Sequence, residues 1–373
     1  MTHVIGGCST YSKTQFLDLP YYPKTLAWGE DVFVYNNDLT WSPPLPDLPL
    51  RWIDFTASLG AIFLGYGAVD RTIINHLKMS GSLLPLPHYI EEETAALFCS
   101  LTGWDCLRWC KNGSDATEAA VRLARWKTGR QGIITNSYHG SHSDLVAATP
   151  GKDGGLLDPV RFFVWPARNS KDIIKQVFEE GAAAVLAEPF TADGQEWNWY
   201  EIADACRKTG TLLIFDEIIT GFRTRLGSAV DVRPDLACYG KVIGNGMPIA
   251  CLAGPHSLMQ AFEEAVFFSG TYAAELLSLA ACHATLTALR SNPPYERLLS
   301  YHERLVNTLT FCTGYPGRLC IDLPKDQHRA FINILAREGI LVGWDFFLMA
   351  AHQEHHIEKT EAAINIAREE LGI

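Results

Sequence analysis

Residues 212–222 read LLIFDEIITGF, an apolar run that ends in two adjacent carboxylates, Asp216 and Glu217. An apolar run without alternation is typical of a strand buried on both faces, as in a parallel sheet covered by helices. A carboxylate is expensive to bury without a partner. Open α/β sheets bind their ligands at the carboxyl ends of the strands. The stretch therefore predicts an α/β fold with a ligand site at Asp216.

The chain around this stretch alternates between short apolar strands and helices. We expect an N-terminal arm (1–55), a large domain with a mostly parallel sheet covered by helices (56–272) and a smaller α+β domain (273–373). Strands are predicted at 132–135, 161–165, 183–188, 211–216 and 250–254, and helices at 68–79, 90–102, 115–127, 273–290 and 357–371. In the helix at 115–127, small residues form one face: Ala116, Ala119, Ala120, Leu123 and Ala124.

Composition narrows the class of protein. The 373 residues are 47% apolar and carry a net charge of −11, which argues against general binding to nucleic acid or to anionic membranes. No apolar run reaches the roughly 18 residues of a membrane span. The start, MTHVIGGCSTYSK, is unlike a secretory signal, so a cytoplasmic location is expected. The ten cysteines are scattered without a CxxC pair, which favours reduced thiols.

A first motif, KNGSDATEAA at 111–120, places Gly113 and Ser114 directly before a helix. The N-terminus of a helix offers free N–H groups and the positive end of a dipole, which suit a phosphate. The other interpretation is a plain N-cap in which Ser114 caps the helix.

Two further motifs lie in predicted loops. NSYHGSH at 136–142 follows a strand and presents Tyr138 and His139, or it is an ordinary turn at Gly140. YGKVIGNGMP at 239–248 places Lys241 in a glycine-rich turn. Glycines let a ligand approach such a lysine closely, although a solvated loop lysine is the alternative.

Taken together, these features match what pyridoxal phosphate needs. Lys241 would form a Schiff base with the aldehyde of the cofactor, and Asp216 would keep the pyridine nitrogen protonated. An aromatic side chain would stack on the ring, and the helix N-terminus would hold the phosphate.

The chain resembles the class III, fold-type I pyridoxal-phosphate aminotransferases, closest to the glutamate-1-semialdehyde aminomutase branch. The resemblance runs in order through the following stretches: GGCSTYSK (6–13), NGSDATEAAVRLAR (112–125), YHG (138–140), AEPF (187–190), LLIFDEIITGFR (212–223), PDLACYGKVIGNGMP (234–248) and FSGTYAAELLSLAA (268–281).

This resemblance implies a role for each site residue. Lys241 is similar to the Schiff-base lysine that also moves protons, and Asp216 to the aspartate that pairs with the pyridine nitrogen. Thr271 is similar to a threonine that reaches the phosphate of the other subunit, which implies a homodimer acting on a small amino substrate. The remaining cofactor contacts implied are Tyr138 and Ile218 on the two ring faces, His139 beside them, and Gly113 and Ser114 at the phosphate. Glu217 is expected to be structural.

The chain departs from the family at positions near the substrate. Tyr272 to Glu275 differ from the usual residues after the threonine, Asn245 replaces a common glycine, and Tyr11-Ser12-Lys13 replaces a Ser-x-x-Arg stretch. Lys13 either contacts a substrate carboxylate or phosphate or is simply exposed. These departures argue against assigning the aminomutase reaction itself.

Three functions therefore stay open at this point. The first is transfer or shift of an amino group. The second is a decarboxylase, retro-aldol enzyme or eliminase with the same cofactor, acting on an amino-acid group that is carried on a sugar or a nucleotide. The third is a non-catalytic descendant, against which the presence of Lys241 and Asp216 argues.

The stretch HQEHH at 352–356 is not a metal motif, because no Glu follows His352 directly. We expect its histidines to be solvated at the start of the last helix, and we expect no metal site.

Overall fold

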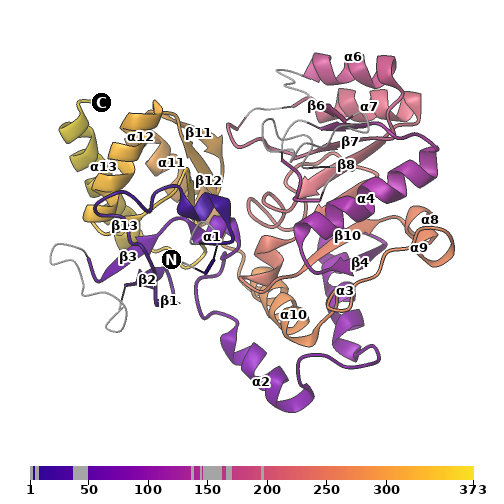
Figure 1. The fold of residues 1–373 in the computed structure, drawn as a ribbon, viewed down its shortest axis with the longest axis horizontal. Helices are drawn as coiled ribbons and strands as arrows, with labels where there is room; N and C mark the ends of the chain where they lie inside the picture. Colours follow the sequence, from indigo (N-terminus) through magenta and orange to yellow (C-terminus); the bar gives the residue numbers. More distant parts are fainter. Residues whose placement is uncertain are drawn as a thin grey trace. The chain divides into compact units, whose positions relative to one another are not determined.

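A computed structural model describes residues 3–4, 8–36, 49–135, 138–142, 145, 162–164, 170–194 and 197–373. The chain forms two compact units. The larger unit comprises residues 69–191 and 195–293, and the smaller comprises 1–68, 192–194 and 294–373 (Figure 1).

The larger unit is built on a seven-stranded sheet with the order β4-β10-β9-β8-β7-β5-β6. Strands β6, β5, β7, β8 and β9 run parallel, which confirms the predicted mostly parallel sheet. Strand β10 runs antiparallel to both β9 and β4, a reversal that its apolar sequence did not reveal. The strands are β4 (Cys106–Cys110), β5 (Ile133–Thr135), β6 (Phe162–Val164), β7 (Ala184–Ala187), β8 (Leu212–Glu217), β9 (Leu236–Tyr239) and β10 (Ala250–Gly254).

Helix α4 (Gly113–Thr128) lies across this sheet in Figure 1 and packs against β9 and β10. Its predicted small-residue face is confirmed, because Ala116, Ala119, Ala120, Leu123 and Ala124 are all fully buried. Within the described residues, the larger unit also contains the helices α2 (Asp70–Ser80), α3 (Tyr89–Thr102), α6 (Ser170–Glu180), α7 (Trp199–Thr209), α8 (His256–Met259), α9 (Ala261–Glu264), α10 (Leu276–Ser291) and the 3-10 turn η3 (Lys241–Gly244).

The smaller unit contains two sheets, β1-β2-β3-β13 and β11-β12-β14. Its strands are β1 (Trp28–Glu30), β2 (Phe33–Tyr35), β3 (Arg51–Asp54), β11 (Cys312–Tyr315), β12 (Arg318–Ile321), β13 (Ile340–Leu341) and β14 (Asp345–Phe347). Its helical segments are η2 (Tyr11–Thr14), α1 (Ala57–Gly60), α11 (Tyr295–Leu309), α12 (Lys325–Arg337) and α13 (Glu354–Leu371).

The division into units differs from the predicted boundaries in two places. The N-terminal segment is part of the smaller unit rather than a separate arm, because β3 pairs in parallel with β13, with Ile53 opposite Ile340 (Figure 1). Helix α10 belongs to the larger unit, where it packs against α2 and α3 and the N–H of Leu276 donates to the carbonyl of Ser82.

The histidines of residues 352–356 are not all solvated, so that prediction is wrong. His352 is fully buried and His356 is 3% exposed. The ring of His352 stacks on Phe55 at 4.3 Å between centroids, and its Nδ1 accepts from the N–H of Met349. Among the described residues, no group of His, Cys, Asp and Glu is placed to hold a metal ion.

Two other expectations concern chain-wide features. All ten cysteines are free thiols. Among the helices that the structure describes, none is long and apolar enough to cross a membrane.

Candidate active site

The candidate site lies at one edge of the seven-stranded sheet. Strands β4, β5, β8 and β9 run in the same direction, so their carboxyl ends meet at this edge. Strand β8 ends there with Asp216 and Glu217, and β9 ends with Tyr239 just before Lys241. Strand β4 leads into α4, and β5 precedes residues 138–142. The four predicted motifs thus converge on one edge, as open α/β sheets require of a ligand site.

Asp216 is held in place by two hydrogen bonds. It is 5% exposed, and its Oδ2 lies 2.7 Å from Nδ1 of His139, which is 2% exposed. Its Oδ1 accepts from the backbone N–H of Ile218 at 3.1 Å. A carboxylate oxygen has two lone pairs, so each oxygen can accept one more hydrogen bond. His139 is thus a partner that the protein itself supplies to Asp216, and both oxygens can still accept from a ligand.

Glu217 faces a different environment. Its Oε2 accepts from the hydroxyl of Thr220 at 2.6 Å, and its Oε1 accepts from the hydroxyl of Ser228 and from the N–H of Ala229 at 2.9 Å. Burial raises the pKa of the Glu217 carboxyl. Glu217 thus ties the following loop to the end of β8, which agrees with the expected structural role.

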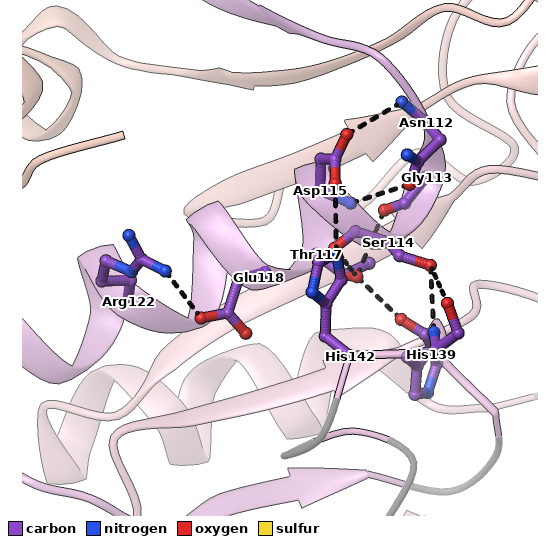
Figure 2. Close-up of polar contacts among 10 residues, drawn as sticks. Asn112, Gly113, Ser114, Asp115, Thr117, Glu118, Arg122, His139 and His142 are labelled. Carbon is purple, nitrogen blue, oxygen red and sulfur yellow. Dashed lines mark hydrogen bonds and ion pairs between the residues drawn. The ribbon is translucent and has the colours of Figure 1, made fainter. Parts of the chain in front are cut away.

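Residues 138–142 are fastened to the first turn of α4, as Figure 2 shows. The hydroxyl of Thr117 donates to the carbonyl of His139 at 2.7 Å, and this contact is buried. The N–H of Ser141 donates to Oγ of Ser114 at 3.0 Å. These bonds fix the backbone on both sides of Gly140, and with it the direction of the His139 ring toward Asp216.

Gly140 is required at its position. Its φ is +125°, and a Cβ there would lie 2.9 Å from Oγ of Ser114. A side chain would therefore push the loop away from α4. A further bond between loop and helix joins Nε2 of His142 to Oδ1 of Asp115 at 3.1 Å (Figure 2).

The N-terminus of α4 has the donors that a phosphate needs. Asn112 and Asp115 form a capping box, in which Asn112 accepts from the N–H of Asp115 at 3.1 Å. Within the part of the chain that the structure describes, the N–H groups of Gly113 and Ser114 donate to no other residue. These two donors stand at the positive end of a 16-residue helix, the arrangement that binds anions. The cap is thus Asn112, and the interpretation of Ser114 as the N-cap is wrong, because Ser114 lies inside the first turn of α4.

Ile218 lies between two glycines. A Cβ on Gly113 would be 3.1 Å from Cδ1 and from Cγ2 of Ile218, and a Cβ on Gly240 would be 3.0 Å from its Cδ1. Both glycines are therefore needed for Ile218 to lie where it does. Gly240 directly precedes Lys241, so this packing brings the lysine turn next to Ile218.

The lysine turn contains left-handed residues. Lys241 has φ +43° and Asn245 has φ +40°. A non-glycine residue in this region is strained, and such strain concentrates at functional sites. Asn tolerates the left-handed conformation better than most residues, which explains how Asn245 can replace a glycine.

The two remaining predicted residues are exposed. Tyr138 is 60% exposed, and its partial burial raises the pKa of its hydroxyl. Thr271 is exposed in the stretch before α10, and none of its described contacts joins it to Asp216. In the same stretch, Glu275 caps α10 through the N–H groups of Leu277 and Ser278 and pairs with Lys111 at 2.9 Å. This departure from the family therefore has a structural role.

The sequence did not identify Thr117, Ser141 and Gly140 as parts of the site. The glycine in NSYHGSH was the one available signal, since a glycine in a loop indicates either a positive φ or a close approach. The bond from Thr117 to His139 joins residues 22 apart in the chain, which no local pattern predicts.

The residues present fit pyridoxal phosphate. Each oxygen of Asp216 can accept one more hydrogen bond, so it can accept from a pyridine N–H. Ile218 can pack against a face of the ring, and the N–H groups of Gly113 and Ser114 at the start of α4 can donate to a phosphate. Lys241, in the turn next to Ile218, would supply the amine that links to the aldehyde. The structure thus supplies an acceptor for the pyridine N–H and donors for the phosphate of this cofactor.

Comparisons with known proteins agree. The family described as Aminotransferase class-III matches residues 50–363. A glutamate-1-semialdehyde 2,1-aminomutase of Caldicellulosiruptor bescii is 29% identical, with 96% of this chain and 93% of the relative covered. Another of that name, from Syntrophobacter fumaroxidans, is 33% identical over 72% of this chain and 68% of the relative.

Solved structures share the fold. The PLP form of the FumI protein of Sphingopyxis sp. MTA144 superposes with a TM-score of 0.86 at 25% identity, covering 99% of this chain and 93% of that one. A glutamate-1-semialdehyde aminomutase of Pseudomonas aeruginosa PAO1 superposes with a TM-score of 0.83 at 18% identity, covering 99% and 92%. The chain belongs to the class III aminotransferases, the fold-type I enzymes that use pyridoxal phosphate to move an amino group.

Proposed function

We propose that the chain transfers an amino group between small molecules, with Lys241 as the residue that links to pyridoxal phosphate. The observation that supports this most strongly is the buried pair of His139 and Asp216, 2.7 Å apart, beside Ile218 and the lysine turn. When bound, the cofactor supplies an aldehyde for amines and a ring that accepts electrons from the substrate carbon.

Each residue then has a defined task. Asp216, oriented by His139 and by the N–H of Ile218, accepts a hydrogen bond from the protonated pyridine nitrogen. The N–H groups of Gly113 and Ser114 hold the phosphate at the start of α4. Ile218 and Tyr138 support the two faces of the ring. The Nζ of Lys241 takes the proton from the substrate Cα and would deliver it to C4′ of the cofactor.

Reduction with borohydride tests the role of Lys241. It fixes the cofactor on the linked lysine, and peptide mass spectrometry then identifies that lysine. We expect the label on the peptide with Lys241 and loss of the visible absorbance of the lysine-bound cofactor in Lys241→Ala. Lys325→Ala, which changes an exposed lysine of α12, is the control and should keep both. A label on another lysine, or an unchanged spectrum in Lys241→Ala, would contradict the proposal.

The reaction itself is tested by its products. With a panel of amino acids and amines, amino transfer releases a keto compound and leaves the aminated cofactor, which absorbs at shorter wavelength. Release of carbon dioxide without a keto product would instead identify a decarboxylase.

We also propose that two copies of the chain pair through an apolar surface of the larger unit. Helix α2 carries Ile74, Leu77 and Met79 but has no buried residue, and Met79 is 84% exposed. Leu86 is 76% exposed and Phe267 is 80% exposed. Exposed apolar side chains of this size are typical of surfaces that bind another protein chain.

Thr271 lies near Leu86. It lines a groove of about 710 Å³ together with Leu86 and Phe268. A threonine at this position could reach the cofactor phosphate of a second copy, as the family resemblance implies. The groove and the exposed apolar residues thus support a homodimer whose sites are shared.

Light scattering and cofactor titration separate the two parts of this proposal. Leu86→Glu should shift the protein toward monomer, whereas Leu50→Glu, at an exposed leucine of the smaller unit, should not. Thr271→Val should stay dimeric and bind pyridoxal phosphate about tenfold more weakly, because a hydrogen bond to a charged group is lost. Full cofactor affinity in both Leu86→Glu and Thr271→Val would contradict shared sites.

A further inference from the structure

An exposed segment of the larger unit, residues 269–272, precedes α10 and carries Thr271. All four of its residues are exposed, whereas Glu275, just after it, is 8% exposed. Within the part of the chain that the structure describes, the side chains of Ser269, Thr271 and Tyr272 make no hydrogen bond. Exposed loops held on a rigid scaffold often carry function, so this segment is available to a second molecule.

Two arginines hold the backbone that leads into the exposed segment. Arg108 of β4 donates from Nε and Nη2 to the carbonyl of Phe268, at 3.1 and 2.6 Å. Arg122 of α4 donates from Nη1 to the carbonyl of Phe267 at 2.8 Å. Its Nη2 pairs with Glu118 at 3.0 Å, so the guanidinium is fixed from both sides (Figure 2). The start of the segment is thus tied to the strand and the helix that meet at the proposed phosphate site.

Lys111 holds the other end of the segment. It lies between the end of β4 and Asn112, the cap of α4. Its ammonium donates to Oε1 of Glu275 at 2.9 Å and to Oγ of Ser278 at 3.3 Å. The side chains of Lys111 and Glu275 are 29% and 11% exposed, so salt screens this pair less than it screens a pair on the surface.

The ammonium of Lys111 is engaged within its own subunit and is not left for an anion. Glu275 neutralises its charge, and Glu275 is itself anchored by the N–H groups of Leu277 and Ser278 at 2.9 Å each. A salt bridge to an anchored carboxylate fixes the backbone next to it. Lys111 therefore acts on the position of the exposed segment, where Thr271 lies.

We propose that Lys111 is a positioning residue for the cofactor of the second subunit. Through Glu275 it fixes the exposed segment, so that Thr271 presents its hydroxyl to the phosphate in the partner copy. Each subunit then holds its own phosphate at Gly113 and Ser114 and shapes one contact to the phosphate of the other. This inference rests on the proposed dimer with shared sites and adds the residue that positions the shared contact.

A double-mutant cycle on the homodimer tests whether Lys111 acts through Thr271. Lys111→Met keeps most of the apolar side chain and removes the charge. It should weaken pyridoxal phosphate binding about threefold to tenfold, while light scattering still finds a dimer. In the Thr271→Val background the same change should alter the affinity by less than about twofold, because the contact that it positions is already lost. An equal loss in both backgrounds would overturn the proposal.

Two further variants separate the ion pair from a general effect of charge. Lys111→Arg keeps a cation that can pair with Glu275 and should bind the cofactor within about twofold of the wild type. Lys175→Met is the matched control, because Lys175 pairs with Glu179 on α6 of the same unit, and it should leave the affinity unchanged. An equal loss in Lys175→Met and Lys111→Met would reduce the effect to net charge and would overturn the role of Lys111.

Mixed dimers decide in which subunit Lys111 acts. Co-expression with two affinity tags yields dimers of one Lys241→Ala subunit and one subunit that keeps Lys241, so only the latter links to the cofactor. When Lys111→Met is placed in the Lys241→Ala subunit, the remaining site receives Thr271 from the altered chain, and its affinity should fall as in the homodimer. When Lys111→Met is placed in the subunit that keeps Lys241, the affinity should equal that of the wild type.

The same mixed dimers separate this inference from the proposed function. A loss of affinity only when Lys111→Met lies in the subunit that keeps Lys241 would show that Lys111 acts on its own cofactor. That result would overturn the inference and leave the proposed function intact. Dimers with Lys241→Ala alone in one subunit should keep half of the visible absorbance of the lysine-bound cofactor. Full absorbance in those dimers, or a monomeric wild type, would refute the proposed function and this inference with it.

Discussion

The packing of Ile218 between two glycines predicts an unusual pattern of compensating mutations. A Cβ on Gly240 would approach Ile218 at Cδ1 alone, at 3.0 Å. A Cβ on Gly113 would approach Cδ1 and Cγ2 at 3.1 Å and Cγ1 at 3.2 Å. Ile218→Val removes Cδ1 but keeps both γ carbons, whereas Ile218→Ala removes all three atoms. Ile218→Val should therefore restore the stability of Gly240→Ala, whereas only Ile218→Ala should restore that of Gly113→Ala.

The magnitudes follow from overpacking, which costs about 1–3 kcal/mol. Gly240→Ala should cost about 1 kcal/mol in the wild type and close to nothing in Ile218→Val. Gly113→Ala should cost the same in the wild type and in Ile218→Val, and close to nothing in Ile218→Ala. Alanine favours a helix over glycine by up to about 1 kcal/mol, but this preference cancels when one glycine variant is compared across backgrounds.

The assays are urea unfolding of the four double and four single variants, which tests packing, and titration with pyridoxal phosphate, which tests support of the ring. The key comparison is Gly240→Ala in the wild type and in Ile218→Val. Independent sites add within about 0.3–0.5 kcal/mol. If the cost of Gly240→Ala is the same in both backgrounds within that margin, Ile218 does not lie between the glycines as described. A cofactor affinity that is unaffected in Ile218→Ala would refute its place under the ring.

Further variants test the loop and the smaller unit. Thr117→Val should lower the free energy of unfolding by about 1–3 kcal/mol, because the buried carbonyl of His139 loses its donor, while Thr117→Ser should keep it; equal losses in urea titrations would contradict this. Gly140→Ala should weaken pyridoxal phosphate binding, because its Cβ would lie 2.9 Å from Oγ of Ser114. Normal affinity would show that the contact between residues 138–142 and α4 does not position the site. Burial lowers the pKa of His352 to about 3, so the unfolded chain takes up its proton first as the pH falls below about 6.5. Stability should then fall by up to about 1.4 kcal/mol per pH unit, with a shallower slope in His352→Phe.

Much of the larger unit could be predicted from local sequence. Strand β8 and helix α4 follow from an apolar run and from a small-residue face that recurs at helical spacing. The direction of β10 could not be predicted, because an apolar strand has the same composition whether it runs parallel or antiparallel to its neighbours. The pairing of β3 with β13 joins distant parts of the chain, and no local pattern encodes it.

The histidines of residues 352–356 show a second limit. Histidine is more often exposed than leucine, so a histidine-rich stretch is predicted to be solvated. Yet His352 stacks on Phe55, and both His352 and His356 use Nδ1 to accept a backbone N–H. A neutral imidazole can fill an apolar space while satisfying one backbone donor, and composition alone cannot distinguish that case.

The contrast between Asp216 and Glu217 explains why one acid of the pair is available to a ligand. Neighbouring residues of a strand point to opposite faces, so both carboxylates are buried but in different surroundings. Glu217 accepts three hydrogen bonds from the loop that follows β8, two of them at Oε1. Asp216 accepts one at each oxygen, so both oxygens keep a free lone pair. Burial makes a charge on either carboxylate unfavourable unless hydrogen bonds or a cation stabilise it. Glu217 has three donors within the protein and Asp216 has two, so Asp216 is the acid that gains more from a cationic ligand. Exchange of the two roles would therefore require the loop at Ser228 to be rebuilt, and a simple swap of the two acids should yield a protein that binds pyridoxal phosphate poorly even where it folds.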